Sequence, residues 1–156
     1  MKNIFFYHTP LGKIAIAENE GAITNLYFEK EIPEGAPFHE TKLLKKAGEQ
    51  LHNYFLGKLK EFDIPLAPTG TDFMKNVWES LCHIPYGETR SYQQIAESIG
   101  NKKASRAVGL ANNRNPIPIF IPCHRVIGAN GKLVGYGGGL EIKSFLLDLE
   151  KKHKSN

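Results

Sequence analysis

The sequence has few cysteines, no long apolar run and no metal-binding motif. Its 156 residues include only two cysteines, Cys82 and Cys123, and their spacing fits neither a CxxC pair nor another common metal-ligand pattern. We therefore expect no bound metal. Nothing indicates export, so a reducing cytoplasm is the simpler expectation than a disulfide. No stretch approaches the length of a membrane span, and the N-terminus reaches a histidine and a Thr-Pro pair too early for a secretory signal.

Positive charge is unevenly distributed along the chain. The formal net charge is +4, but residues 1–66 hold 8 basic against 9 acidic residues, whereas residues 67–156 hold 12 basic against 7 acidic residues. A basic half joined to a nearly neutral half predicts a polyanionic partner such as nucleic acid. The alternative is a solvated basic surface that has no partner.

The first half has the pattern of a small unit that contains both strands and a helix. Strand-like segments in residues 3–28 are divided by turn sequences, which predicts a meander, and the alternation of residues 13–18 predicts that its middle strand is half-buried. Apolar residues at a four-residue spacing predict a helix from about residue 43 to residue 55, with Thr41 as its cap and Gly57 as its stop. Residues 61–64 could add a short strand. No cluster of side chains in this half suggests catalysis.

The second half reads as mostly helical. A proline- and glycine-containing linker at residues 65–70 coincides with the change in charge, so we expect an N-terminal domain over residues 1–66 and a C-terminal domain over residues 70–156. Two short helices, at residues 91–100 and 104–111, are joined by a tight turn and form a helix-turn-helix pattern. The second of them is basic, as a recognition helix must be, although helix hairpins also occur in proteins that bind no nucleic acid.

Three further patterns complete the second half. A helix that begins at Thr71 or Asp72 has one apolar face, and we expect Cys82 to lie in the core on that face. The Asn130-Gly131 pair is a strong hairpin signal, and a hairpin after a helix-turn-helix predicts a winged-helix module. The glycine-rich stretch at residues 135–139 allows close approach of the backbone, but it lacks the context of a dinucleotide-binding fingerprint.

The stretch from Asn115 to Val126 contains the strongest candidate for chemistry. Three prolines predict a rigid, extended segment rather than a paired strand, and this segment leads to Cys123. Two side chains that can carry positive charge, His124 and Arg125, follow the cysteine, and such neighbours raise the fraction of reactive thiolate. The alternative is a buried cysteine that only fills space.

The residues around this cysteine carry a resemblance. The Ile-Pro-Cys-His-Arg-Val motif at residues 121–126 resembles that of the O6-alkylguanine-DNA alkyltransferases, and the similarity is close from about residue 73 to residue 150. The matching positions include Asn115-Pro116, Tyr86-Gly87, Ser91 to Gln94, Arg106 to Gly109 and Gly138 to Leu140. The first half agrees with this family only in order and length. The resemblance implies an α+β protein with an N-terminal ribonuclease-H-like α/β domain and a C-terminal winged-helix-like DNA-binding domain.

The resemblance also implies a function and a set of site residues. Such a protein flips an O6-alkylated guanine, mainly O6-methylguanine, out of double-stranded DNA and moves the alkyl group permanently onto its cysteine, so each molecule reacts once; O4-methylthymine is a further candidate substrate. It needs no cofactor, and we expect a cytoplasmic monomer. Some relatives hold a structural zinc in the N-terminal domain, but this chain has no cysteine there, so we predict no metal. The implied catalytic residues are Cys123, His124, Glu150 and Asn115. The implied pocket residues are Tyr92, Val126, Tyr136 and Gly137, and the implied DNA-binding residues are Tyr92, Gln93, Asn101, Arg106 and Arg125.

One departure and two alternatives accompany this interpretation. Many relatives carry a side chain where Gly137 stands, so the pocket here could be wider. The first alternative is a winged-helix regulator or a non-transferring sensor of alkylated DNA, but a sensor lacks the reactive cysteine that Cys123 supplies. The second is a cysteine hydrolase, which usually brings its histidine from a distant part of the chain; here His124 is adjacent to the cysteine.

Overall fold

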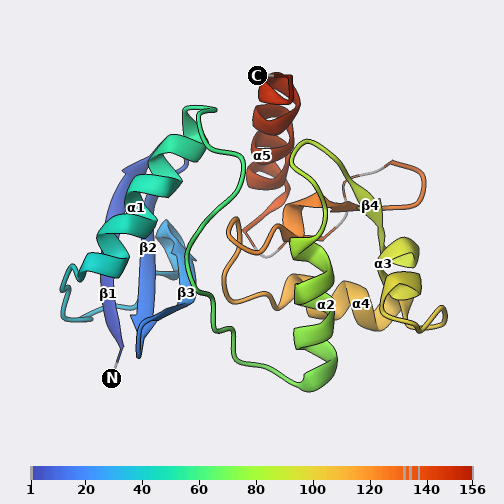
Figure 1. Ribbon diagram of the computed structural model, residues 1–156, viewed down its shortest axis with the longest axis horizontal. Coiled ribbons are helices and arrows are strands. Elements are labelled where there is room, and N and C mark those ends of the chain that lie inside the picture. The colour runs from blue at the N-terminus through green and yellow to red at the C-terminus, as the bar shows by residue number, and fades with distance from the viewer. Residues whose placement is uncertain (1, 132, 134, 137, 156) are drawn as a thin grey trace. The chain divides into compact units, whose positions relative to one another are not determined.

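The computed structural model describes residues 2–131, 133, 135–136 and 138–155 (Figure 1). The chain divides into two compact units, Met1–Thr69 and Gly70–Asn156. None of the described helices combines the length and the apolar character needed to cross a bilayer.

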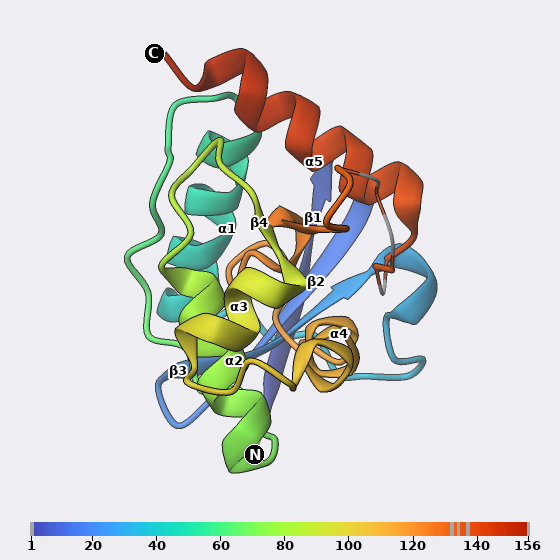
Figure 2. The same cartoon turned by 90° about the vertical axis from the view of Figure 1, so that its right-hand side faces the viewer.

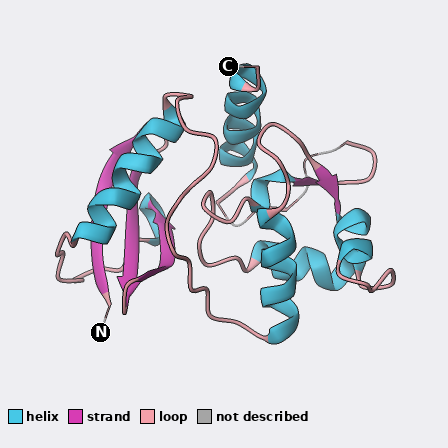
Figure 3. Cartoon of the chain, in the orientation of Figure 1, coloured by secondary structure: helices cyan, strands magenta, loops and turns pink. Residues whose placement is uncertain are grey.

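The first unit is a three-stranded antiparallel sheet with one long helix packed against it (Figure 3). The strands are β1 (Asn3–Thr9), β2 (Gly12–Asn19) and β3 (Ala22–Phe28), and they lie in the order β1-β2-β3. The 3₁₀ helix η1 (Glu29–Glu31) and the helix α1 (Lys42–Phe55) follow. The predicted meander and helix are therefore confirmed, and the Thr41 side chain caps α1 by accepting a hydrogen bond from Leu44 N at 3.2 Å.

Strand β2 is more deeply buried than its alternating pattern predicts. Ile14 and Ile16 are both fully buried. Ala15 and Ala17, which alternate with them along the strand, belong to a second apolar cluster against which Ile32 packs. Because helix α1 contacts the sheet and the segment after β3 adds further apolar cover, both sets of alternating side chains are removed from water. The expectation of a half-buried strand is therefore wrong for β2.

The short strand expected at residues 61–64 does not form. Instead, the side chain of Gln50 accepts a hydrogen bond from Asp63 N at 2.9 Å, which ties this segment to helix α1. The chain returns to the sheet only at Leu66, which forms an isolated parallel bridge with Ile23. A side chain from the helix thus satisfies the backbone that a strand would have paired.

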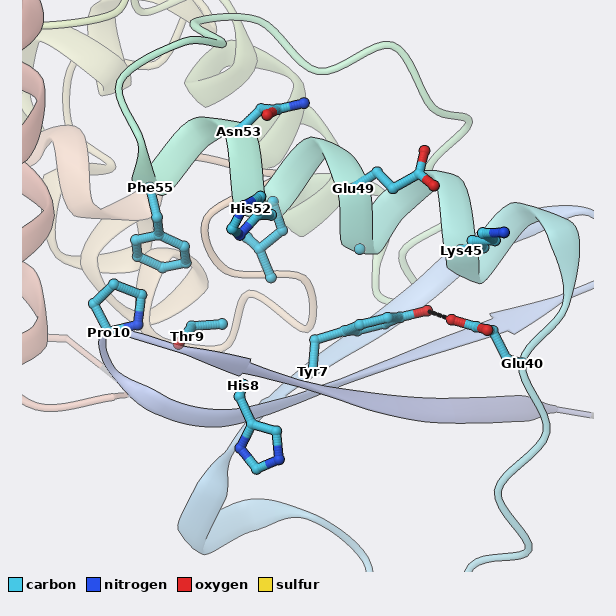
Figure 4. A pocket seen from close by; sticks show the side chains of 12 residues that line it. Tyr7, His8, Thr9, Pro10, Glu40, Lys45, Glu49, His52, Asn53 and Phe55 are labelled. Atoms are coloured by element: carbon cyan, nitrogen blue, oxygen red, sulfur yellow. Dashed lines mark hydrogen bonds between the residues drawn. The ribbon is translucent and has the colours of Figure 1, made fainter.

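Tyr7 of β1 packs against α1 at Gly48, and both residues line a groove of about 540 Å³. The Tyr7 hydroxyl donates a hydrogen bond to Glu40 Oε2 at 2.7 Å (Figure 4). Burial and the neighbouring Glu40 carboxylate raise the pKa of Tyr7, so the hydroxyl remains a donor. A Cβ atom at Gly48 would lie only 2.5 Å from the Tyr7 ring. Glycine is therefore required here for close packing of the helix on the strand.

We predict that Gly48→Ala destabilises the first unit. Alanine gains about 1 kcal/mol in helix propensity, but overpacking against a ring costs about 1–3 kcal/mol, so we expect a net loss of up to about 2 kcal/mol in the free energy of unfolding. Urea unfolding followed by circular dichroism measures it. In a Tyr7→Leu background the same substitution should become neutral or stabilising. Equal effects in the two backgrounds would contradict the packing argument.

The second unit is a cluster of helices with one short sheet. Its helices are α2 (Asp72–Cys82), α3 (Tyr92–Ser98), α4 (Ser105–Asn113) and α5 (Leu140–His153), with the 3₁₀ helix η2 (Cys123–Arg125) between α4 and α5. Helices α2, α3 and α4 pack against one another (Figure 2), which confirms the predicted helix-turn-helix. Ser91 and Gln94 form a reciprocal capping box at the start of α3, and Gly100 follows that helix with a φ of 79°.

The hairpin expected around Asn130-Gly131 is seen only in part. The strand β5 (Val126–Ile127) pairs in parallel with β4 (Arg90–Ser91). A turn follows, in which Gly131 N donates to Gly128 O at 2.9 Å. The expected second strand contains residues 132 and 134, which lie outside the described residues. Among the residues that are described, the partner of β5 is therefore β4.

The prediction for Cys82 is wrong. Val77, Trp78 and Leu81 of α2 are buried, but Cys82 is exposed. Helix α2 ends at this residue, so the periodicity that places its neighbours in the core no longer decides what covers it. The other cysteine, Cys123, is the buried one.

Candidate active site and nucleic-acid interface

The segment that precedes Cys123 is a compact turn and not the extended arm that its prolines predict. Ile121 N donates to Ile117 O at 2.9 Å, so the chain folds back within four residues. Asn115 braces this turn from within: its Nδ2 donates to Ile121 O at 2.8 Å, and its Oδ1 accepts from Ile117 N at 2.9 Å. Ile117 and Ile121 are buried. Prolines fix φ in turns as well as in extended chains, which is why the sequence did not separate the two.

The turn also holds backbone strain. Ile119 has a φ of 74°, in a region that β-branched residues almost never adopt. Such a conformation costs about 1–3 kcal/mol and persists only when the surroundings impose it. Its side chain is buried, with 1% of its surface exposed. Packing therefore holds this segment in place against its local backbone preference.

Glu150 of α5 gathers three partners in the interior of the second unit. Its Oε2 lies 2.6 Å from His124 Nε2, and the Arg125 guanidinium donates to both of its oxygens, at 2.8 and 3.0 Å. Gly87 N donates to Oε1 at 3.1 Å. Burial alone would raise the pKa of Glu150, but His124 and Arg125 outweigh it and hold the pKa well below the usual range. Glu150 is therefore a carboxylate.

This arrangement fixes the proton on His124. Burial lowers the pKa of the imidazole below its ordinary value, although Glu150 opposes the shift, and this direction favours the neutral ring. A carboxylate can only accept hydrogen bonds, and Nε2 must therefore donate to it. The lone pair then resides on Nδ1, which is buried and has no hydrogen-bond partner in the described part of the chain. Nδ1 of His124 is thus a basic nitrogen that makes no hydrogen bond within the described part of the chain.

Cys123 is buried, with 3% of its surface exposed. Burial raises the pKa of its thiol to about 11, and interactions with Asn115, Lys143 and Tyr136 oppose the rise. The thiol is therefore protonated in the resting protein. A reaction at the sulfur requires a group that removes this proton, and His124 is the adjacent base.

Lys143 is a site residue that sequence analysis missed. It is fully buried, and its Nζ donates to the backbone carbonyls of Val126 and Gly135. Burial lowers its pKa to about 8, while Cys123 opposes the shift. The buried residues of α5 are Lys143, Leu146 and Glu150, a spacing that follows one helix face. Only Leu146 on this face is apolar, so the sequence pattern of the helix gives little sign that Lys143 is buried.

Two of the predicted DNA-binding residues, Tyr92 of α3 and Arg106 of α4, line one open concave surface. Tyr92, Lys103, Ser105, Arg106 and Gly109 line this space of about 800 Å³. A Cβ atom at Gly109 would lie 3.8 Å from the Tyr92 ring, which is ordinary van der Waals contact, so α4 passes close to the start of α3 here. Gln93 and Asn101 are both exposed, and the Gln93 side chain donates to Lys102 O at 2.9 Å.

The expectation for Arg125 is not supported. Only 6% of its surface is exposed. Its guanidinium binds Glu150, donates to Ile84 O at 2.8 Å and lies over the Tyr86 ring. All of these partners are inside the protein, so Arg125 is not available to contact DNA.

The remaining pocket predictions have mixed outcomes. Val126 is fully buried, and Tyr136 is 9% exposed and interacts with the Cys123 thiol. Gly137 lies outside the described residues. Asn112 of α4, which the sequence did not single out, is buried and donates a hydrogen bond to Cys123 O at 3.3 Å.

Two family models match the chain, one over each half. The model of the ribonuclease-like domain of 6-O-methylguanine DNA methyltransferases covers residues 5–68. The model of the DNA-binding domain of the same proteins covers residues 72–152. A helix-turn-helix unit with a buried cysteine beside a histidine thus coincides with a known DNA-binding domain.

Known relatives agree over nearly the whole chain. The methylated-DNA–protein-cysteine methyltransferase of Methanosarcina barkeri is 57% identical over 151 residues, which is 93% of this chain and 94% of that protein. The constitutive enzyme of Bacillus subtilis is 50% identical, with 92% of each chain covered. The crystal structure of Mycobacterium tuberculosis OGT in complex with DNA superposes with a TM-score of 0.90 at 47% identity, covering 97% of this chain and 94% of that one.

Fold and site define a protein with an N-terminal ribonuclease-like domain and a C-terminal DNA-binding domain that encloses a buried cysteine. The chain belongs to the family of the 6-O-methylguanine DNA methyltransferases, also called methylated-DNA–protein-cysteine methyltransferases.

We predict that Glu150→Gln strongly destabilises the second unit. The change keeps the size of the side chain but leaves the Arg125 guanidinium buried without a counter-ion, which typically costs about 3–5 kcal/mol. Fluorescence of Trp78, the single tryptophan, reports unfolding of this unit. Glu88→Gln is the matched control, because its ion pair with Arg90 is partly exposed and should contribute less than about 1 kcal/mol.

The pH dependence supplies a second measurement. The pKa of Glu150 is depressed in the folded protein, so its contribution is present above the unfolded value of about 4.3 and is lost as the pH falls toward the folded value. The wild-type protein should therefore lose stability as the pH falls below about 5, and Glu150→Gln should lose less over the same range. Parallel curves for the two proteins would contradict the assignment.

Proposed function

We propose that this protein repairs DNA by direct reversal, moving the alkyl group of an O6-alkylated guanine onto Sγ of Cys123. Family membership supports methyl transfer to a protein cysteine. The observation that carries the assignment of residues is the contact of His124 Nε2 with Glu150 Oε2 at 2.6 Å, which leaves Nδ1 of the residue after Cys123 without a partner among the described residues. O6-methylguanine is the main expected substrate, and O4-methylthymine is a further one.

The reaction is a displacement at the alkyl carbon. The Cys123 sulfur forms a bond to this carbon, the bond from the carbon to O6 breaks, and guanine leaves with the electron pair and gains a proton. The thiol proton passes to His124 Nδ1, through a water, because the thiol is protonated at rest. Glu150 then stabilises the imidazolium, in the manner of a triad. The thioether has no route back to a thiol, so each molecule reacts once.

Lys143 assists this step through its charge. The ammonium group is fully buried beside the backbone carbonyls of Val126 and Gly135, and its charge lowers the pKa of Cys123 against the effect of burial. Positive charge in a low-dielectric site favours the thiolate as it forms.

The substrate must leave the base stack to reach the buried sulfur. Unstacking costs a few kcal/mol, and we propose that Arg106 inserts into the vacated position while Tyr92 crowds the neighbouring phosphate. Both residues line the concave surface between α3 and α4. Gln93 and Asn101 extend the contacts to the DNA backbone, and backbone groups at Val126, Tyr136 and Gly137 read the edge of the flipped base. A cytoplasmic monomer fits this function.

The first test is mass spectrometry of the protein after mixing with a duplex that carries one O6-methylguanine. We expect the gain of one methyl group, confined to the peptide that contains Cys123. Cys123→Ala should gain none, and Cys82→Ser should react like the wild type, since Cys82 is exposed and is distant in sequence from the proposed base. Unmodified protein that still prefers the lesion would favour a non-transferring sensor, and no lesion preference would overturn the proposal.

A second prediction concerns base flipping. Arg106→Ala should slow methyl transfer from duplex DNA by about tenfold or more, because the gap in the stack is no longer filled at a cost of over 1 kcal/mol. Transfer from a single-stranded oligonucleotide should change much less. Lys103→Ala is the control: it removes one charge from the same surface and should weaken binding to both substrates in a salt-dependent way. If Arg106→Ala slowed methyl transfer equally from duplex and from single-stranded DNA, Arg106 would have no role in base flipping.

A further inference from the structure

Asn112 lies in the last turn of helix α4 and contacts the residue that bears the reactive thiol. Its side chain is buried, with 1% of the residue surface exposed. Its Nδ2 donates a hydrogen bond to the backbone carbonyl of Cys123 at 3.3 Å. Its Oδ1 is buried as well and has no hydrogen-bond partner among the described residues. The proposed chemistry assigns no role to this side chain.

Stability does not explain an asparagine at this position. A buried amide oxygen without a partner carries a desolvation penalty. An apolar side chain of similar volume would avoid that penalty and pack against the same neighbours. The residues around it, Val108 and Ala111 of the same helix, are buried and apolar. We therefore look for the reason for an asparagine in the hydrogen bond that its Nδ2 group donates.

The donor joins the helix of the DNA-binding surface to one particular peptide group. The carbonyl of Cys123 belongs to the planar unit that also contains the backbone nitrogen of His124, and this plane turns as a whole. Its orientation sets the direction of the thiol on one side and of the imidazole on the other. One hydrogen bond to this carbonyl thus constrains the two reacting groups together.

Helix α4 is itself well fixed at this end. Trp78 of α2 donates a hydrogen bond from Nε1 to Ala111 O at 2.9 Å, in the buried interior. Arg106, which lines the concave surface, lies in the first turn of the same helix. A contact between DNA and the start of α4 is therefore transmitted along a rigid element to the residue that holds Cys123.

We propose that Asn112 is a positioning residue of the alkyl-transfer reaction. Its hydrogen bond holds the Cys123–His124 peptide in a fixed orientation relative to helix α4. This inference rests on the proposed function. It assigns to Asn112 no contact with the substrate. Its effect is on the alignment of the thiol with its base, so it belongs to the transfer step and not to DNA binding.

The test is the variant Asn112→Leu in the full chain, with Asn113→Leu as the matched control. Asn113 is the next residue of the same helix and is exposed. Single-turnover methyl transfer is measured at saturating duplex with one O6-methylguanine. We expect Asn112→Leu to slow transfer by about tenfold or more, as misalignment of reacting groups does. Affinity for the lesion duplex should change less than about twofold, and the unfolding temperature should hold or rise.

A pH profile separates positioning from general damage to the fold. With the thiol misaligned, transfer in Asn112→Leu depends on thiolate formed in advance, and the thiol pKa is raised to about 11. The deficit relative to the wild type should therefore be larger at about pH 6.5 than at about pH 9.5. The titratable groups that interact with this thiol are unchanged in the variant, namely Lys143, Tyr136 and Tyr92, and so is the neighbouring His124.

Several results would overturn the inference. If the wild type and Asn112→Leu transfer the methyl group at equal rates, Asn112 has no positioning role and the proposed function stands. If the wild type transfers no methyl group, the proposed function itself is rejected. Asn112→Met, which is flexible and fills irregular space, serves as the second variant if leucine does not fit. A deficit in both variants that is independent of pH and accompanied by lower stability would assign Asn112 a structural role only.

Discussion

The buried carboxylate of Glu150 is the interaction on which the second unit depends. It connects α5 to η2 through His124 and Arg125, and to the turn before β4 through Gly87 N. A charge at 1% exposure is tolerable only when it is fully paired. Here the pairing requires residues that lie 25, 26 and 63 positions away in the sequence. The ion pair and the candidate active site therefore both require the same distant segments of the chain to come together.

The same carboxylate determines what the histidine can do. By accepting from Nε2 it leaves the lone pair of His124 on Nδ1, and by retaining its own charge it can stabilise an imidazolium. Arg125 keeps Glu150 ionised at low pH. A protonated carboxyl group could itself donate a hydrogen bond, and it would then no longer hold the imidazole proton on Nε2. The motif arginine thus binds both oxygens of Glu150, and a lysine would not replace this two-oxygen contact. Basic contacts to DNA must come from the helix-turn-helix.

Local signals predicted most of the fold, whereas tertiary partners decided the errors. The meander, the Thr41 cap and the box at Ser91 follow from turn and capping chemistry within a few residues. Of the site, Cys123 and its histidine were evident from the motif. Arg125 was misassigned because a basic residue beside a cysteine serves an ion pair as readily as a phosphate, and only the fold supplies Glu150. The resemblance to a family, rather than periodicity, brought Glu150 into the site.

Lys143 and Asn112 show why the remainder of the site is hard to read from sequence. Each is a polar residue that its helix buries against backbone carbonyls, and neither belongs to a recognisable motif. We propose that both act on Cys123 without being adjacent to it in the sequence, Lys143 through its charge and Asn112 through the Cys123–His124 peptide group. Their burial makes sense only once a thiol must be kept protonated at rest and activated on demand. In a site of this kind the function depends on the residues packed around the motif, and the motif itself identifies only the position of the sulfur.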